Sequence, residues 1–166
     1  MTSVSVVIPA YNAESVVSTV LASVAAQTRQ PEQVIVVDDG STDSTTAAAQ
    51  RWSALLPITV VRLEENLGAG KGAGGARAEA IRHAEGDLIA LVDVDDYWLP
   101  DHLAVMLREH EAHGGLITAN CVLWVPENEL GRTPSAELVP VPPPRDQCSE
   151  ILSENFVFVS TLFTRE

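Results

Sequence analysis

The sequence predicts an α/β fold, a three-layer α/β/α sandwich built around a mainly parallel central sheet. Short apolar runs rich in β-branched residues alternate with segments whose apolar positions recur at helical spacing. Two of these runs, Val34–Val37 and Leu88–Val92, end abruptly in aspartates. Continuous apolar runs are typical of strands buried on both faces, and strands that alternate with helices imply right-handed crossovers between parallel neighbours.

The first half of the chain contains three predicted strands, Val4–Ile8, Val34–Val37 and Ile58–Leu63. Asn12 is expected to cap the helix that follows the first strand, and Ser41 to cap a second helix that runs to about Trp52. The apolar positions of the first of these helices follow helical spacing, at Val16, Val17, Val20, Leu21 and Val24.

In the second half, a glycine-rich loop and a helix over about Gly74–Ala84 lead into the strand at Leu88. Pro100 is expected at the first position of a helix that faces inward through Leu103, Met106 and Leu107. The segments that follow are a strand over Leu116–Val125, an extended proline-rich loop over Pro126–Pro144 and a last strand over Phe156–Phe163. We therefore expect a core over residues 1–125 and a second part over residues 126–166 that starts another half of a longer protein.

Composition restricts the classes of partner. With 46% hydrophobic and 20% charged residues, the chain of 166 residues has the make-up of a globular domain. The formal charge of −13 argues against nucleic acid as a partner, because phosphate backbones require clustered lysines and arginines. The two cysteines are not spaced as a metal site, and the sequence carries no apolar run of membrane-spanning length or secretory signal. We expect a cytoplasmic protein.

Asp93 and Asp95 lie two residues apart just after the Leu88–Val92 run. In an extended chain their side chains share one face, and ligands of parallel sheets bind beyond the carboxyl ends of the strands. Two carboxylates so close repel each other unless a cation lies between them, and hard oxygen ligands suit Mg²⁺ or Mn²⁺. We therefore favour a metal site that bridges to a phosphate ligand. The alternative is an acidic turn before the helix that Pro100 opens.

Asp39 and Tyr11 lie at the same predicted edge of the sheet. A carboxylate after the second strand can accept a hydrogen bond from a ribose hydroxyl or a base N–H group, as acidic residues do in dinucleotide-binding folds. A turn followed by a helix cap explains this stretch equally well. The ring of Tyr11 could stack on a base, with ordinary packing as the alternative.

The segment Asn66–Arg77 contains five glycines and two cations, Lys71 and Arg77. Glycines let the backbone approach a ligand, and free N–H groups before a helix favour phosphate. Lys71 and Arg77 are natural partners of a diphosphate. The G-x-G-x-x-G match at Gly70 is weak, because it follows the third strand and not the first. A solvated loop without a ligand is the alternative.

Together these stretches resemble the inverting family 2 glycosyltransferases of GT-A, Rossmann-like fold. The resemblance rests on four motifs, which are Ser5–Asn12, Val37–Asp43, Ala76-Arg77 and Asp93–Asp96, in matching order over nearly the whole chain. It implies an N-terminal donor-binding part. Its residues for the nucleotide base, ribose and diphosphate would be Pro9, Ala10, Tyr11, Asp39, Lys71, Arg77 and Val94. Asp93 and Asp95 resemble the D-x-D motif of that family, with catalytic roles as ligands of Mn²⁺ or Mg²⁺.

The resemblance implies transfer of a sugar from a nucleotide-diphosphate sugar, UDP-linked by default and GDP-linked otherwise. The acceptor stays open among a sugar, a polysaccharide and a polyprenyl phosphate, since Gly70-Lys71-Gly72 is similar to polyprenyl-phosphate sugar transferases. We expect the acceptor-activating base beyond the end of this chain, and peripheral attachment of the full-length protein to the inner face of the membrane is an open alternative. Two further hypotheses are a donor-binding module without turnover and a sugar nucleotidyltransferase.

Overall fold

The computed structural model describes residues 2–68, 73–119, 121–125, 135–139 and 161–165. In chain order its elements are β1 (Val4–Ala10), α1 (Val17–Ala25), β2 (Gln33–Asp38), α2 (Thr45–Gln50), the 3₁₀ helix η1 (Arg51–Ala54), β3 (Ile58–Arg62), α3 (Gly74–Arg82), β4 (Leu88–Leu91), α4 (His102–His113), β5 (Ile117–Thr118), β6 (Cys121–Val125), β7 (Ser135–Val139) and β8 (Thr161–Thr164).

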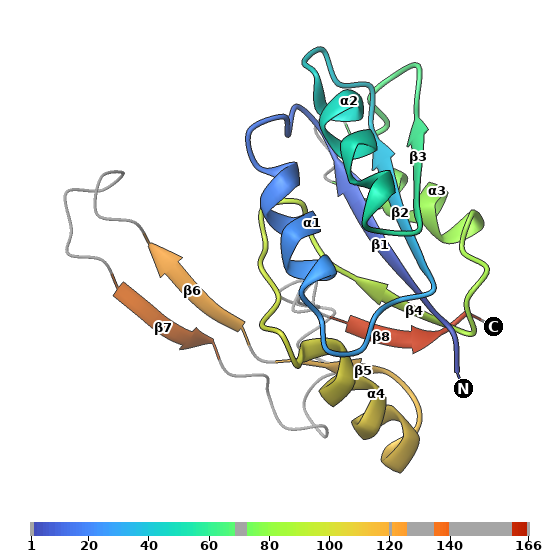
Figure 1. Cartoon of the computed structure of the whole chain (residues 1–166), viewed down its shortest axis with the longest axis vertical. Coiled ribbons are helices and arrows are strands. Elements are labelled where there is room, and N and C mark those ends of the chain that lie inside the picture. Colours follow the sequence, from blue (N-terminus) through green and yellow to red (C-terminus); the bar gives the residue numbers. More distant parts are fainter. Residues whose placement is uncertain (1, 69–72, 120, 126–134, 140–160, 166) are drawn as a thin grey trace.

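Six of the strands form one sheet in the order β3-β2-β1-β4-β8-β5 (Figure 1). The pairs β1–β2, β1–β4 and β2–β3 are parallel, whereas β8 runs antiparallel to both β4 and β5. The prediction of a mainly parallel sheet is therefore confirmed, with one antiparallel strand inserted. Because β8 lies beside β4, the segment Thr161–Thr164 belongs to the same sheet as the strands of the first half of the chain. The division of the chain into two parts at residue 125 stays a prediction.

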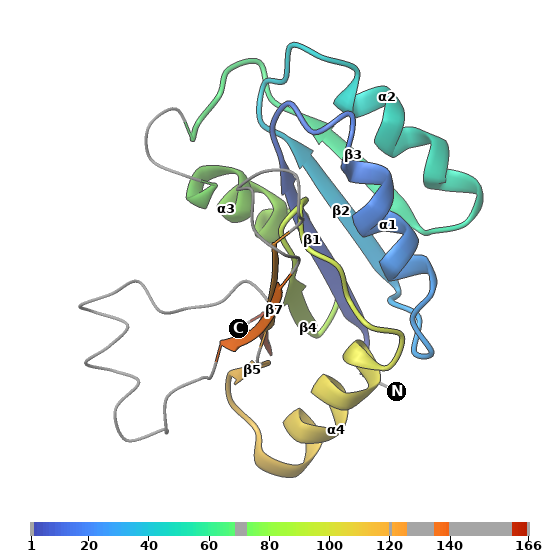
Figure 2. The ribbon, with the colours of Figure 1, turned by 90° about the vertical axis from the view of Figure 1, so that its left-hand side faces the viewer.

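Helices cover both faces of this sheet, so the three-layer prediction is confirmed. In Figure 2, α1 and α2 lie on one side of the strands and α3 lies on the other. The core divides accordingly: apolar side chains of α1, α2 and α4 pack on one face, and those of α3 pack on the opposite face. Leu103, Met106 and Leu107 of α4 are buried as predicted. Every residue of β1 is buried, as expected of a strand covered on both faces.

The predicted strand over Leu116–Val125 is wrong as a single element. Its start forms β5, which pairs with β8 in the main sheet, and its end forms β6, which pairs with β7 in a separate two-stranded sheet. Figure 1 shows the β6–β7 ribbon standing apart from the main sheet. An apolar run carries no information on which partner it pairs with, so the sequence pattern could not reveal this division.

The predicted cap of the first helix is also wrong. α1 begins at Val17, and Val16 precedes it without a side-chain capping bond. Asn12 instead adopts a left-handed conformation, with a φ of 47°. Its Oδ1 accepts a hydrogen bond from the Thr42 amide at 2.9 Å. Since β1 and β2 are parallel neighbours, the loops after them lie side by side, and a partner across the loops replaces the local cap.

Two other predicted helix starts move for a similar reason. Ser41 does not cap α2, which begins at Thr45, because the Ser41 hydroxyl accepts a hydrogen bond from the Asn12 amide at 2.9 Å. Pro100 lies two residues before α4, and its carbonyl accepts the amide of Thr28 at 2.8 Å. Tertiary contacts therefore set these boundaries within two to four residues of the predicted ones.

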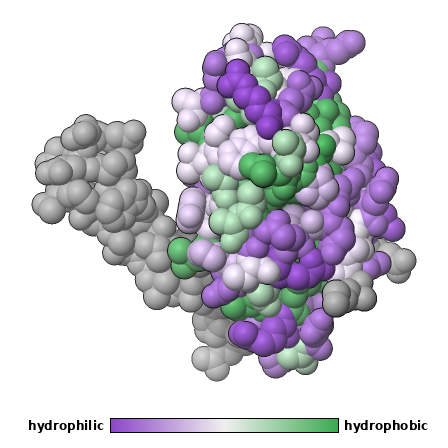
Figure 3. All heavy atoms as spheres, viewed as in Figure 1, coloured by the Kyte–Doolittle hydropathy of each residue, from purple (hydrophilic) through white to green (hydrophobic). Residues whose placement is uncertain are grey.

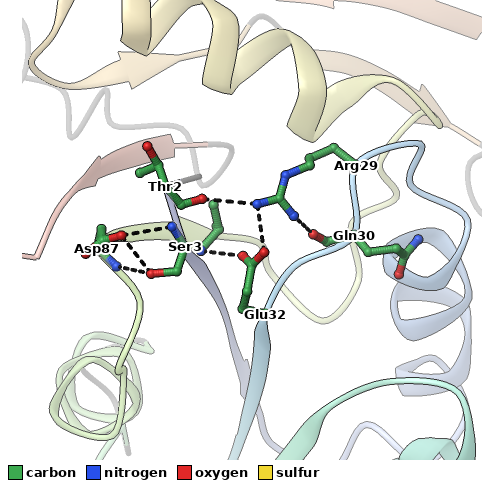
Figure 4. A network of polar contacts seen from close by, with 7 residues as sticks. Thr2, Ser3, Arg29, Gln30, Glu32 and Asp87 are labelled. Atoms are coloured by element: carbon green, nitrogen blue, oxygen red, sulfur yellow. Dashed lines mark hydrogen bonds and ion pairs between the residues drawn. The ribbon is translucent and has the colours of Figure 1, made fainter.

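A polar network ties together the edge of the sheet at which the parallel strands begin (Figure 4). Asp87 accepts hydrogen bonds from the amide and hydroxyl of Ser3 at 2.9 and 2.8 Å, and these bonds lower the pKa of Asp87 below its ordinary value. Arg29 donates to Glu32 at 2.8 Å and to the Thr2 carbonyl at 3.1 Å. These bonds therefore tie together the segments that lead into β1, β2 and β4.

The described surface is mixed in character. On the face shown in Figure 3, hydrophobic and hydrophilic residues are interspersed. In the part of the chain that the structure describes, we find no helix with the length and apolar character that a membrane crossing requires.

Candidate functional site

A cavity of about 410 Å³ lies where the parallel strands end. It is lined by residues from four segments of the chain, which are Pro9, Ala10, Tyr11, Asp39, Asn66, Gly68, Ala73, Ala76, Arg77, Asp93, Val94 and Asp95. Parallel strands bring their carboxyl ends to one edge of the sheet. Asp38 at the end of β2 lies beside Ala10, whereas β4 ends at Leu91 beside Val7, so Asp93 follows two residues after that pair.

The cavity brings together eight residues that the sequence singles out. They are Pro9, Ala10, Tyr11, Asp39, Arg77, Asp93, Val94 and Asp95. Lys71 lies outside the described residues. The shared cavity is a structural fact, while the role of each residue toward a ligand stays a prediction.

Asp38 and Asp39 follow one another at the end of β2 but have different surroundings. Asp38 is fully buried, and its carboxylate accepts hydrogen bonds from the Ser41 amide at 2.9 Å and from the Thr46 hydroxyl. Asp38 therefore stabilises the turn that follows β2. Asp39 is 4% exposed, and its amide donates to the Ala10 carbonyl at 2.8 Å. The carboxylate of Asp39 reaches the segment after β3, with bonds to the amides of Leu67 at 2.7 Å and Gly68 at 2.9 Å.

Arg77 and Asp93 form an ion pair in the wall of the cavity, with 2.6 Å between Nη2 and Oδ1. Arg77 projects from the first turn of α3, and about a quarter of each side chain is exposed. Arg77 Nε is buried, and it has no hydrogen-bond partner among the described residues. Because the Arg77 side chain is partly exposed and lines the cavity, an anion that entered the cavity would meet its positive charge.

The acidic run after β4 continues past the cavity. Asp95 is exposed and lines the cavity, whereas Asp96 does not line it. The Asp96 amide donates to the Asp93 carbonyl at 3.1 Å, which makes a tight turn. The surrounding protein removes water from Asp96 and, with the nearby charges of Asp93 and Asp95, raises the pKa of its carboxyl above the ordinary value. Negative charge therefore accumulates at this end of β4.

The side chains that line the cavity supply only some of the oxygen ligands that a hard divalent cation requires. Asp93 and Asp95 supply carboxylate oxygens, which Mg²⁺ and Mn²⁺ prefer. Within the described ranges, no group of three or more His, Cys, Asp or Glu side chains is arranged to hold a metal ion. Mg²⁺ typically completes its six ligands with water and phosphate oxygens, so two carboxylates fit a metal that arrives with a phosphate ligand.

Our sequence interpretation missed several lining residues, above all Asn66. Its Oδ1 is buried without a hydrogen-bond partner among the described residues. Buried polar atoms usually have partners, so this atom has an unused capacity to bind a ligand. The signal in the sequence was its position just after the third strand and before the glycine-rich stretch, where loop residues at a strand end reach a ligand.

Comparisons with known proteins agree with this geometry. Residues 5–160 match the sequence model of glycosyl transferase family 2. The poly(ribitol-phosphate) β-N-acetylglucosaminyltransferase TarS of Staphylococcus aureus is 36% identical over 113 residues, which are 65% of this chain and 19% of TarS. The UDP-Glc:α-D-GlcNAc-diphosphoundecaprenol β-1,3-glucosyltransferase WfgD of Escherichia coli is 36% identical over 63% of this chain and 39% of its own length. The chain therefore spans less than half of these two relatives.

Solved structures share the fold. A crystal structure of S. aureus TarS 1-349 in complex with UDP-GlcNAc superposes with a TM-score of 0.70 at 23% identity, over 98% of this chain and 45% of that one. The mannosyltransferase PcManGT of Pyrobaculum calidifontis, in complex with GDP-Man and Mn²⁺, has a TM-score of 0.63 at 29% identity, over 71% of this chain and 35% of that one.

Proposed function

The chain belongs to glycosyl transferase family 2, and on that premise we propose that it forms the donor-binding part of an enzyme that transfers a sugar, with inversion, from a nucleotide-diphosphate sugar. The observation that carries the proposal is the convergence of four chain segments on one cavity at the carboxyl edge of the sheet. A cavity of about 410 Å³ is of the size that small ligands and cofactors occupy.

We assign the nucleoside to the side of the cavity near the ends of β1 and β2. Pro9 and Ala10 form a wall there, and Tyr11 offers a ring that is 49% exposed and free to stack on a base. Asp39 contributes a buried carboxylate, whose oxygens have lone pairs beyond the two bonds that they accept from the backbone.

We assign the diphosphate to the side formed by α3 and the end of β4. Arg77 provides the charge that a diphosphate requires, and Lys71 provides a second one in the glycine-rich segment. Asp93 and Asp95, with Val94 between them, would hold Mn²⁺ or Mg²⁺ against the same diphosphate. Such an ion acts as a Lewis acid and offsets the charge of the departing nucleotide.

UDP is the default donor nucleotide because the name of WfgD includes UDP-Glc, and GDP is the alternative because PcManGT was solved with GDP-Man. The acceptor class stays open among a sugar, a polysaccharide and a polyprenyl phosphate; the name of TarS contains poly(ribitol-phosphate), and that of WfgD contains GlcNAc-diphosphoundecaprenol. We propose that the donor is drawn from the cytoplasm.

Calorimetric titration of the purified chain with UDP and then with GDP, each with Mn²⁺ and with chelator, tests the proposal. We expect one of the two nucleotides to bind in a metal-dependent way, since two carboxylates and the diphosphate complete one ligand set. Asp87→Asn, at the opposite edge of the sheet, is the control and should leave the affinity unchanged. Absence of binding for both nucleotides would contradict the donor assignment.

A second measurement separates turnover from mere binding. Release of free UDP from a UDP-sugar in the presence of an acceptor would identify a transferase, while binding without release would favour the module without turnover. Release of pyrophosphate from a nucleoside triphosphate and a sugar phosphate would instead identify a nucleotidyltransferase.

A further inference from the structure

We infer that Asp39 is a positioning residue for the phosphate-binding side of the site, in addition to any contact with the nucleoside. The inference rests on the proposed function. Asp39 stands at the end of β2, but its carboxylate is directed at the segment that leads from β3 into the glycine-rich stretch. Its loss should therefore displace Asn66 and Gly68, which line the cavity together with Asp39.

Both oxygens of the Asp39 carboxylate accept hydrogen bonds from backbone amides of this segment. Oδ1 accepts the amide of Leu67 at 2.7 Å, and Oδ2 accepts the amide of Gly68 at 2.9 Å. The two consecutive N–H groups are held in a fork, much as a carboxylate binds two donors of one guanidinium. The side chain is 4% exposed, so water competes poorly for these bonds. In the described part of the chain, they are the hydrogen bonds that attach residues 64–68 to the rest of the protein.

Close backbone contacts hold the same segment from both sides. Gly40 has a φ of 71°, and a Cβ built on it would lie 2.8 Å from the amide nitrogen of Asn66. A Cβ on Gly75, in the first turn of α3, would lie 2.8 Å from Leu67 Cβ. The segment is thus enclosed between the end of β2 and the start of α3, and the Asp39 carboxylate fixes its position along this gap.

The segment that Asp39 holds contributes residues to the wall of the cavity. Asn66 and Gly68 line the cavity on one side of the glycine-rich stretch, and Ala73 and Arg77 line it on the other. Arg77 is the described residue to which we assign contact with the diphosphate, and Leu67 lies against Gly75 in the same turn of α3. If Asp39 fixes this segment against α3, a diphosphate without any base must depend on Asp39. If Asp39 contacts only the base or ribose, the affinity of a ligand without a nucleoside must be unchanged when Asp39 is substituted.

The decisive experiment compares inorganic pyrophosphate, uridine and UDP as ligands, each with Mn²⁺, on the wild-type chain, Asp39→Ala and Asp39→Asn. We expect Asp39→Ala to weaken pyrophosphate and UDP by about tenfold or more, and Asp39→Asn, which keeps one acceptor oxygen, to weaken them less. Tyr11→Ala is the matched control from the same cavity: it should weaken uridine and UDP and leave pyrophosphate unchanged. Unchanged pyrophosphate affinity in both Asp39 variants would overturn the inference.

Hydrogen exchange of the free chain gives a readout that needs no ligand. The amides of Leu67 and Gly68 should be protected in the wild type and should exchange at least tenfold faster in Asp39→Ala, with the amides of β1 and β2 unchanged. Fast exchange of both amides in the wild type would refute the positioning role even if UDP binds well. If the wild type binds neither UDP nor pyrophosphate but protects both amides, the proposed function fails and the positioning of the segment stands.

Discussion

At the residue scale, Arg77 is placed so that its guanidinium can interact with two anions, the Asp93 carboxylate and a diphosphate. Arg77 Nη2 lies 2.6 Å from Asp93 Oδ1, and a diphosphate in the cavity would approach the same guanidinium. Without a ligand, Arg77 neutralises a carboxylate that would otherwise lie unpaired among Asp95 and Asp96. A metal ion would compete with Arg77 for Asp93 and release the guanidinium toward the diphosphate.

Arg77→Gln should therefore change two affinities in opposite directions. Mn²⁺ alone should bind more tightly, by a few-fold, because its competitor for Asp93 is gone. UDP with Mn²⁺ should bind about tenfold more weakly or worse, since a charge-assisted contact to the diphosphate is lost. Titrations of Mn²⁺ alone and of UDP at saturating Mn²⁺ measure both effects. A loss of both affinities would mean that Arg77 supports Asp93 and does not compete with the metal.

Asp95→Ala should reduce the UDP affinity measured with Mn²⁺ to the value measured with chelator, while the thermal midpoint of unfolding stays close to that of the wild type. The side chain is exposed, so its removal leaves no cavity in the core. Asp96→Ala is the matched control, because it removes the same charge from a position that does not line the cavity. An equal loss in both variants would point to a general field effect of the acidic run.

At the element scale, the loops after parallel strands are fixed by one another, and this explains where sequence reasoning succeeded. The strand ends and their aspartates followed from apolar runs that stop abruptly, so the site edge was predictable. The starts of α1 and α2 were not, because Asn12 bonds to Thr42 and the Ser41 hydroxyl to Asn12. A capping residue has the same sequence signature whether its partner is local or in the next loop.

A substitution at Gly40 tests the contact between the loop after β2 and the loop after β3. Gly40→Ala should lower the free energy of unfolding by about 2 kcal/mol or more, because it combines a left-handed φ with a Cβ 2.8 Å from the Asn66 amide nitrogen. Gly115→Ala is the matched control: its φ is 73° with nothing within 4 Å, so it should cost only about 1 kcal/mol. Urea denaturation measures both. Equal costs would show that the Asn66 segment moves aside easily.

At the scale of the whole molecule, the polar groups differ between the two ends of the parallel strands. The edge at which the strands begin carries a closed polar network around Ser3, Glu32 and Asp87. The other edge collects unbalanced carboxylates in a chain of net charge −13, and this is where a cation and a diphosphate are expected together. The sequence allowed prediction of the acidic end of the strands, since the carboxyl ends of parallel strands meet there. It did not allow prediction of the antiparallel β8, whose place depends on its pairing with β4 and β5.

The stability of the whole fold should depend on pH through His102, the first residue of α4. Its ring stacks on Trp98, with 4.7 Å between centroids, and burial lowers its pKa to about 4. Above pH 6.5 His102 is neutral in both states, and below pH 4 it is protonated in both. Between these values only the unfolded chain takes up the proton, so stability falls as pH falls from 6.5 to 4.

The loss across this window should be on the order of 2 kcal/mol, allowing for the partial exposure of the ring. His102→Phe keeps the stacking on Trp98 and removes the proton site, so its free energy of unfolding should change less between pH 6.5 and 4. His113→Gln, on the same helix with a side chain that is 71% exposed, is the control and should keep the slope of the wild type. Urea denaturation in chelator at several pH values measures the slopes. If His102→Phe retains the full slope, other groups carry the acid sensitivity and the buried imidazole does not govern it.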